Sequence, residues 1–216
     1  MKRTVCCLLL ICLLAATPIS LAACRRAPRV DDIREDVIAL VEASYEINEV
    51  FYGAGLPVLD RNSEEYAPLY TFNYAPATIT NTYDIVDVAH AKFTSIDAIK
   101  SAASLVYSPD LLEKNLYVNA FTGYAIEGIN STVVASDALY TEDADYFYQS
   151  ASRTNYLTRG VKIFDYDTMQ VVRPSSSKAV LITMDAWYIS NPTEHFSERI
   201  RLVSTPNGWR LDSATV

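Results

Sequence analysis

Cysteine is confined to the first 24 residues of this chain. Three of its four cysteines lie in or beside an apolar stretch near the N-terminus, and the fourth is Cys24. Residues 25–216 therefore cannot form an internal disulfide, a thiolate metal site or a Cys–His nucleophile. Histidine is also scarce, and the spacing of the two residues, His90 and His195, fits no zinc motif. The sequence predicts neither a metal site nor a cofactor.

Basic residues are in short supply as well. The chain has 18 Lys and Arg against 26 Asp and Glu, which gives a formal net charge of −8 at pH 7. Nucleic-acid binding is not expected, because contacts to phosphates need clustered Lys and Arg. The exception is a local basic cluster, Arg25, Arg26 and Arg29, beside Cys24. Each of these residues could add up to ~1 kcal/mol of attraction to an anionic bilayer.

Long apolar runs and flexible linkers are missing too. The apolar stretch at residues 5–16 has 12 residues, whereas a helix that spans a bilayer needs roughly 20. After about residue 30 no segment rich in Pro, Gly or Ser divides the chain. We therefore expect a single domain over residues 32–216, which is long enough to bury one core.

The N-terminus has the order of a secretory signal: Lys2 and Arg3, the apolar stretch, and then small residues. Its last four residues, Leu21-Ala22-Ala23-Cys24, resemble the bacterial lipobox. The resemblance implies a signal peptide, residues 1–23, that is cleaved before Cys24, and a diacylglycerol on the thiol of Cys24. Residues 24–31 would then be a lipidated tether on the extracytoplasmic face of the cell membrane. The alternative is an ordinary signal peptide with an incidental cysteine.

A long amphipathic helix is predicted at residues 33–52. Its apolar residues fall on one face at 100° per residue, and its glutamates fall on the other. Asp31 or Asp32 would cap its N-terminus. Two polar residues, Ser44 and Asn48, interrupt the apolar face. Asn48 must find hydrogen-bond partners in the core or face a cavity, so it is also a candidate ligand-binding residue.

The signals in the middle of the chain are weaker. Residues 56–82 are rich in turn formers and tyrosines and are expected to be irregular or weakly extended. Residues 83–89 could form a short strand.

Two further helix starts can be identified. Thr94 followed by Asp97 resembles a capping box, which opens a helix over about residues 95–106. Ser108 before a proline fits the N-cap of another helix, which would end near Asn119.

The C-terminal quarter changes to strand periodicity. Four β-rich segments lie at residues 161–173, 178–189, 195–204 and 209–214. Turn formers such as Asn191-Pro192 and Asn207-Gly208 separate them. We expect an antiparallel meander with one solvent-exposed face. Helices followed by consecutive antiparallel strands predict an α+β fold, in which N-terminal helices pack on a C-terminal meander sheet.

Two family resemblances follow from this layout. The element order and the ending Asn207-Gly208-Trp209-Arg210-Leu211-Asp212 resemble NTF2-like (cystatin-like) α+β domains over about residues 32–216. This resemblance implies a cone-shaped fold with a pocket. The segment from Ser95-Ile96-Asp97 to Leu105-Val106-Tyr107 resembles secreted inhibitors of bacterial cell-wall DL-endopeptidases, and no residue maps onto a known inhibitory surface.

Asp84, Asp87 and His90 are the candidates for enzymatic chemistry. Some NTF2-like enzymes use an Asp/His pair for proton transfer, so the resemblance implies general-base catalysis if Asp87 and His90 face a pocket. On the strand expected here, however, the two side chains would point to opposite faces. We therefore predict that the protein is not an enzyme, and a small-molecule enzyme that uses this pair is the alternative.

Tyrosine is the one residue type in excess, with 15 in the chain. A tyrosine ring offers an apolar face and a hydroxyl, which suits contacts with proteins and sugars. Tyr146 and Tyr148 follow the acidic segment 142–145, where burial is harder, so we expect them to be exposed and to bind a partner. Packing between strands is the other interpretation.

The function expected from the sequence is therefore non-enzymatic binding by a membrane-anchored, extracytoplasmic lipoprotein. Its partner would be a protein of the cell envelope or a small ligand. Inhibition of a cell-wall hydrolase is a further alternative.

Overall fold

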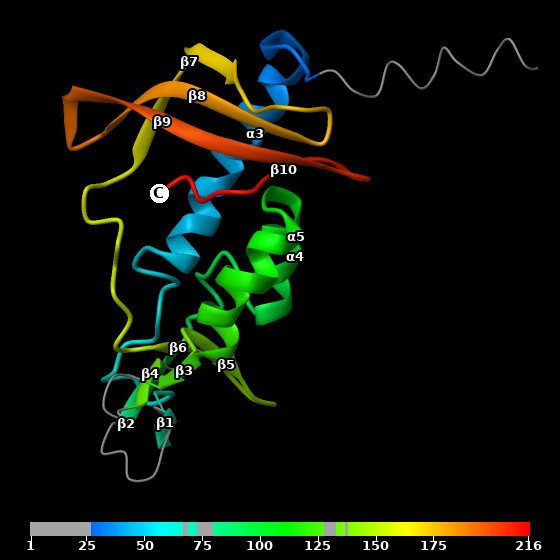
Figure 1. The fold of residues 1–216 in the computed structure, drawn as a ribbon. Helices are drawn as coiled ribbons and strands as arrows, with labels where there is room; N and C mark the ends of the chain where they lie inside the picture. Colours follow the sequence, from blue (N-terminus) through cyan, green and yellow to red (C-terminus); the bar gives the residue numbers. More distant parts are fainter. Residues whose placement is uncertain (1–26, 67–68, 73–79, 128–132, 137) are drawn as a thin grey trace, which may run out of the picture.

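The computed structural model describes residues 27–66, 69–72, 80–127, 133–136 and 138–216. The expected signal peptide and Cys24 lie outside these residues. The chain has a mixed α+β fold with two antiparallel four-stranded sheets and a separate hairpin. We call the sheet of strands β7 to β10 the meander and the sheet of β1, β2, β5 and β6 the small sheet. Helix α3 extends from beside the meander, at the top of Figure 1, toward the small sheet at the bottom.

Helix α3 spans Val30–Phe51 and confirms the predicted amphipathic helix. It begins three residues earlier than expected, because its N-cap is Arg29 and not an aspartate. The carboxylate of Asp32 instead accepts a hydrogen bond from the backbone N–H of Arg29 at 2.8 Å. Asp32 thus acts as the N3 residue of a capping box, which satisfies an N–H at the start of the helix. The buried face of α3 carries Ser44 and Asn48 with it.

The meander confirms the four predicted C-terminal strands. All three neighbouring pairs are antiparallel, and the spatial order is β10-β9-β8-β7. The strands are β7 (Lys162–Val172), β8 (Ala179–Tyr188), β9 (Asn191–Thr205) and β10 (Gly208–Leu211).

The turn between β8 and β9 is displaced from its prediction. Tyr188 pairs with Asn191, so Ile189 and Ser190 form the turn, and Asn191-Pro192 begins β9. A proline is tolerated at the start of a strand, where a missing N–H removes little of the ladder.

The last hairpin is displaced by one residue as well. Thr205 pairs with Gly208, so Pro206 and Asn207 form the turn. Gly208 follows as the first residue of β10 with φ of 98°, a left-handed conformation that glycine adopts without strain. Proline suits the first turn position because its ring fixes φ.

Helix α4, Ile96–Val106, confirms the second predicted helix, but its N-cap is Ser95 and not Thr94. The Ser95 hydroxyl accepts a hydrogen bond from the backbone N–H of Ala98 at 3.1 Å. The cap is one residue later than the capping-box pattern suggested, and serine fills the role equally well.

Ser108 caps the next helical segment, as predicted. This segment consists of α5 (Pro109–Leu111) and the π-helical turns η2 (Leu112–Leu116) and η3 (Val118–Thr122). It continues three residues beyond the predicted end at Asn119.

The small sheet was predicted only in part. Its spatial order is β1-β2-β6-β5, and its members are β1 (Leu69–Phe72), β2 (Thr80–Ile85), β5 (Tyr140–Glu142) and β6 (Phe147–Ser150). Residues 56–82, expected to be irregular or weakly extended, supply β1 and the start of β2. The strand expected at 83–89 ends at Ile85. Strands β3 (Tyr124–Glu127) and β4 (Val133–Ser136) pair only with each other among the described residues.

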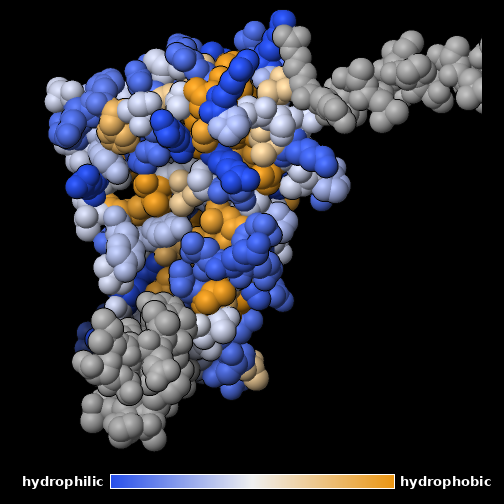
Figure 2. Space-filling view, in the orientation of Figure 1, coloured by the Kyte–Doolittle hydropathy of each residue, from blue (hydrophilic) through white to orange (hydrophobic). Residues whose placement is uncertain are grey.

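One hydrophobic core joins these parts. It contains the buried face of α3, residues of α4, the inner face of the meander around Ile182 and Ile200, and Tyr140 and Phe147 of the small sheet. Figure 2 shows apolar residues between the meander at the top and the lower part of the molecule, within a largely hydrophilic surface. The N-terminal helices therefore pack on the meander as predicted, and the small sheet shares their core.

Arg153 fixes the C-terminal end of α3 to the small sheet. The last carbonyls of a helix have no partner within the helix. Arg153 Nη2 donates to the carbonyl of Val50 at 2.8 Å, and Nε donates to that of Gly53 at 3.1 Å. Nη1 donates to the hydroxyl of Tyr140 in β5 at 2.7 Å and to Oε1 of Gln149 in β6 at 3.2 Å. One guanidinium thus links the helix end to two strands.

We predict that Phe51→Ala lowers the free energy of unfolding by about 3–5 kcal/mol, the usual effect of removing a buried aromatic ring. Phe51 is buried at the end of α3 and contacts the rings of Tyr117 and Phe121. The matched control is Leu105→Ala on α4, whose side chain is largely exposed and should change stability by less than ~0.5 kcal/mol. Urea denaturation measures both. A loss below 1 kcal/mol for Phe51→Ala would contradict the packing of this helix end.

Candidate functional site

Two exposed apolar side chains, Val88 and Tyr146, mark one end of the small sheet. They are 49% and 42% exposed. Strands β2 and β6 are antiparallel neighbours, so the residues after β2 lie beside the residues before β6. The backbone N–H of Val86 accordingly donates to the carbonyl of Phe147 at 2.8 Å. The fold therefore brings together two segments that are about 60 residues apart in sequence.

Two adjoining clefts surround this pair. Val88, Asp145, Tyr146 and Phe147 line both of them, and we call the two clefts together the Tyr146 groove. The first cleft, of about 480 Å³, is also lined by Leu59, Glu65, Ile85, Val86, Asp87 and Ala89. The second, of about 360 Å³, is also lined by Thr94, Glu142, Asp143 and Ala144. The exposed Tyr146 and Val88 thus stand between two hollows.

The charge of the Tyr146 groove is entirely negative. Its lining includes five carboxylates and no Lys, Arg or His among the described residues: Glu65, Asp87, Glu142, Asp143 and Asp145. The lining thus combines these carboxylates with apolar side chains, of which Val88 and Tyr146 are exposed. This arrangement favours a ligand that carries both apolar surface and positive charge.

Asp143 holds the loop that presents Tyr146. Its Oδ1 accepts hydrogen bonds from the backbone N–H groups of Asp145 and Tyr146, each at 2.9 Å. Its Oδ2 accepts one from the hydroxyl of Tyr148 at 3.1 Å. The backbone donors at Asp145 and Tyr146 hold the pKa of Asp143 below its usual value, so the carboxylate remains charged at neutral pH. The position of Tyr146 depends on this ionised side chain.

Tyr148 is buried, and the expectation that it is exposed like Tyr146 is wrong. Its side chain packs with Tyr83 and Ile85 of β2. The acidic neighbours do not prevent burial, because Asp143 provides the partner that the hydroxyl needs. Burial, followed by the hydrogen bond to the Asp143 carboxylate, raises the pKa of Tyr148 to about 12. Its ring lies edge-on to Tyr146, with 6.0 Å between centroids, and supports that residue from below.

Asn48 lies in a buried polar network between α3 and the C-terminal segment. Its Nδ2 donates to the hydroxyl of Thr215 at 2.8 Å, and its Oδ1 accepts a hydrogen bond from the hydroxyl of Tyr107. Ser44 and Thr215 share a hydrogen bond at 2.6 Å. Of the two situations that the sequence allowed, the structure has the hydrogen-bonded core residue. Both polar atoms of the Asn48 amide have protein partners.

Asp87 and His90 lie in contact, so the prediction that they point to opposite faces is wrong. Strand β2 ends at Ile85, and both residues belong to the turn that follows. Asp87 Oδ2 lies 2.7 Å from His90 Nδ1. The hydrogen bond from His90 is the main cause that lowers the pKa of Asp87. The imidazole is 78% exposed, however, so the pair is a surface interaction.

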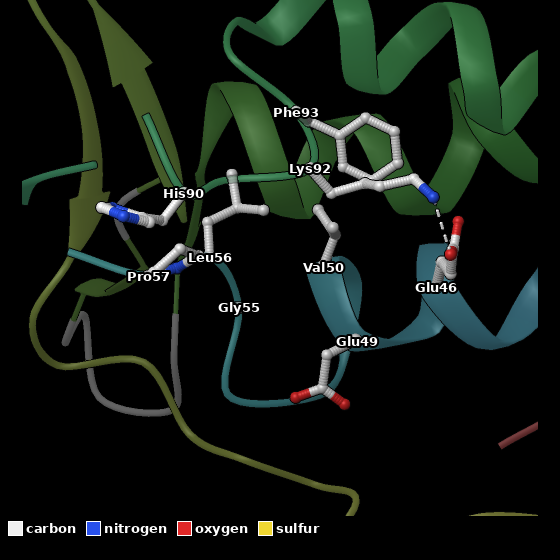
Figure 3. A pocket seen from close by; sticks show the side chains of 9 residues that line it. All are labelled: Glu46, Glu49, Val50, Gly55, Leu56, Pro57, His90, Lys92 and Phe93. Atoms are coloured by element: carbon white, nitrogen blue, oxygen red, sulfur yellow. Dashed lines mark hydrogen bonds and ion pairs between the residues drawn. The ribbon is translucent and has the colours of Figure 1, made fainter. Parts of the chain in front are cut away.

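The two members of this pair line different clefts. Asp87 lines the Tyr146 groove, whereas His90 lines a smaller cleft of about 270 Å³. The apolar floor of this cleft consists of Val50, Leu56 and Phe93. Figure 3 shows His90 on one side of this floor and the ion pair of Lys92 and Glu46, 2.8 Å apart, on the other. General acid–base chemistry requires polar groups that converge on one point. The polar groups around this cleft do not converge in this way.

The remaining candidates for chemistry are taken up by other interactions. Asp84 is buried, pairs with Arg61 at 2.9 Å and accepts a hydrogen bond from Tyr66. His195 stacks on Trp187, with 4.7 Å between ring centroids. Within the part of the chain that the structure describes, no group of three or more His, Cys, Asp or Glu residues could hold a metal ion.

The sequence did not identify Val88, Glu65 or Asp87 as neighbours of Tyr146. The signal that the sequence offered is a valine among polar residues in the segment Asp87-Val88-Ala89-His90. The structure shows that this valine is exposed. Its meaning depends on the pairing of β2 with β6, which no local pattern encodes.

We predict that Tyr148 titrates with a midpoint near pH 12, two units above the ordinary value of 10.0. Because the folded state favours the neutral phenol, the stability linked to Tyr148 is fully present below pH 10 and is lost as the pH rises through 12. NMR titration of ¹³Cζ-labelled tyrosine, with Tyr148→Phe for assignment, measures the midpoint. Asp143→Asn should lower it, because the negative charge beside the hydroxyl is removed. A midpoint near 10 in the wild type would contradict the buried, carboxylate-bonded position.

No protein-family model matches this chain, and no curated protein sequence matches it either. None of the described helices is long and apolar enough to cross a membrane.

Proposed function

We propose that this chain is a lipoprotein, anchored through Cys24 to the extracytoplasmic face of a bacterial cell membrane, that binds a protein partner through the Tyr146 groove. The observation that carries this proposal is the position of the groove. The tether leads into the N-terminal end of α3, and the small sheet lies beyond its other end (Figure 1). A helix of 22 residues is about 33 Å long.

The short tether supports this orientation. Five residues separate Cys24 from the start of α3 at Val30, so the distance from Cys24 to Val30 can be at most about 20 Å. The meander end of the domain would therefore stay near the bilayer. Without the signal peptide, which contains Lys2 and Arg3 and no acidic residue, the formal charge is −10. An anionic bilayer would repel so acidic a domain and favour an upright position.

A finer fold assignment is part of the proposal. The long first helix across a four-stranded antiparallel meander supports an NTF2-like cone, to which the small sheet is an addition. The hydrogen bonds among Asn48, Thr215 and Tyr107 occupy the polar groups between α3 and the C-terminal segment. Binding in the groove, outside the cone, is therefore favoured over binding of a small ligand within it.

One observation favours an enzyme instead. The 2.7 Å contact between Asp87 and His90 is the geometry of an oriented general base. The exposure of His90 and the separation of the two clefts weigh against it. Inhibition of a cell-wall hydrolase is a special case of partner binding, and the same groove would serve it.

We predict that Cys24→Ala abolishes incorporation of a labelled fatty acid and moves the protein out of the membrane fraction. The reason is that the thiol is the only site for a thioether-linked diacylglycerol that the lipobox resemblance implies. Metabolic labelling and fractionation of the native host measure both effects. Unchanged labelling and partitioning of the variant would show that the anchor is elsewhere.

We predict that Tyr146→Ala reduces the recovery of an envelope partner at least tenfold, because an exposed aromatic ring at the centre of a contact contributes most of its energy. Tyr156→Ala is the matched control, since Tyr156 is 70% exposed and lines neither cleft of the groove. His90→Ala should also leave binding intact. Quantitative co-purification of the lipidated protein after in-cell crosslinking compares the variants. Equal loss with Tyr146→Ala and Tyr156→Ala would contradict the proposed surface, and an activity that disappears with His90→Ala would favour the enzyme.

A further inference from the structure

We infer that the Tyr146 groove binds a cationic segment of its protein partner, in which Lys or Arg side chains alternate with apolar ones. This inference rests on the proposed function and names the chemistry of the partner. It is carried by the arrangement of charges and apolar surface in the groove.

The groove brings five carboxylates together without a Lys, Arg or His among the described residues that line it. Some exposed carboxylates elsewhere have a cation beside them, as in Asp110–Lys114 and Glu46–Lys92, and others on the described surface, such as Asp97 and Asp185, have no ion pair. In the groove, the described residues provide a partner of this kind only for Asp87, which contacts His90. The result is a concentration of negative charge without local compensation, which an external cation can relieve.

Two of these carboxylates are available to change their orientation. Glu142 accepts a hydrogen bond from the backbone N–H of Ile96 at 3.0 Å, and Asp143 is held by its loop. The side chains of Asp145 and Glu65, by contrast, form no hydrogen bond or ion pair with any residue that the structure describes, and both are exposed. They lie at the rim of the larger cleft, where they could close on a guanidinium or ammonium group.

The centre of the groove selects for more than charge. The ring of Tyr146 presents an electron-rich face, which attracts a cation placed over it. Val88 beside it offers only apolar surface, and its burial by a partner would be favourable. A simple polyamine would satisfy the rim and leave Val88 exposed, whereas a peptide with both kinds of side chain satisfies both.

The size of the groove agrees with a peptide segment. The two clefts, of about 480 and 360 Å³, lie on either side of Tyr146 and Val88. A segment laid across this ridge can place one side chain in each hollow.

The test uses the lipidated protein in nanodiscs and two pooled 12-residue peptide libraries. Both have Leu, Val, Phe or Tyr at half of the positions. The other half is Lys or Arg in the first library and Glu in the second. Fluorescence anisotropy measures binding at 50 and 200 mM salt. The cationic library should bind at least tenfold more tightly, and its affinity should fall as the salt concentration rises.

The variants separate the groove from the general acidity of the protein. The double change Asp145→Asn with Glu65→Gln should weaken binding of the cationic library about tenfold and reduce its salt dependence. Tyr146→Ala should weaken it without changing the salt dependence. Asp110→Asn with Glu113→Gln removes two charges on the helical segment after Ser108 and should have no effect. Equal weakening by this control pair would mean non-specific attraction and would overturn the inference.

The peptide-binding experiment and the recovery of the envelope partner together distinguish failure of this inference from failure of the proposed function. If the cationic library binds no better than the acidic one, while recovery of the envelope partner still requires Tyr146, the inference is overturned and the proposed function stands. If recovery of the partner does not depend on Tyr146 either, both are overturned.

Discussion

The position of the candidate site depends on the interaction of one arginine with the end of one helix. Buried carbonyls at the C-terminal end of a helix need donors from outside the helix, and the hydroxyl of Tyr140 in β5 donates to that of Val50 at 3.1 Å. Arg153 donates to the carbonyls of Val50 and Gly53, and the same guanidinium reaches Tyr140 and Gln149. The strands that carry the Tyr146 groove are therefore attached to α3 itself, and the groove takes its direction from the helix.

A second polar cluster joins α3 to its neighbours within the main core. Ser44 and Asn48 of α3 bind Thr215, and Asn48 also binds Tyr107 at the end of α4. Because these buried polar groups find their partners when α3, α4 and the C-terminal segment are arranged as they are here, the network favours a single packing of the core. The polar groups of this network are thus hydrogen-bonded within the protein, whereas the exposed Val88 and Tyr146 lie beside carboxylates at one end of the small sheet.

Elements with a long, regular pattern could be predicted from the sequence. Helix α3 and strands β7, β8 and β9 have enough periodic residues for the 3.6- and 2-residue repeats to be distinguished, and the short β10 follows the turn signal Asn207-Gly208. The small sheet could not be predicted, because its strands have three to six residues and β2 pairs with β6 across a long insertion. The misplacement of His90 follows from this, since the strand ends at Ile85. The burial of Tyr148 depends on Asp143, a partner that only the folded loop provides.

In the orientation that we propose, α3 holds the Tyr146 groove away from the membrane. Residues 25–216 contain no cysteine, so Val88→Cys and Asp167→Cys each introduce a unique thiol for a fluorophore. Val88 lies in the groove, and Asp167 lies in β7 beside Arg34 of α3, with its side chain 96% exposed. The measurement is quenching by spin-labelled lipid headgroups after reconstitution of the lipidated protein in vesicles. The account predicts strong quenching at position 167 and little at position 88; equal quenching, or the reverse, would contradict it.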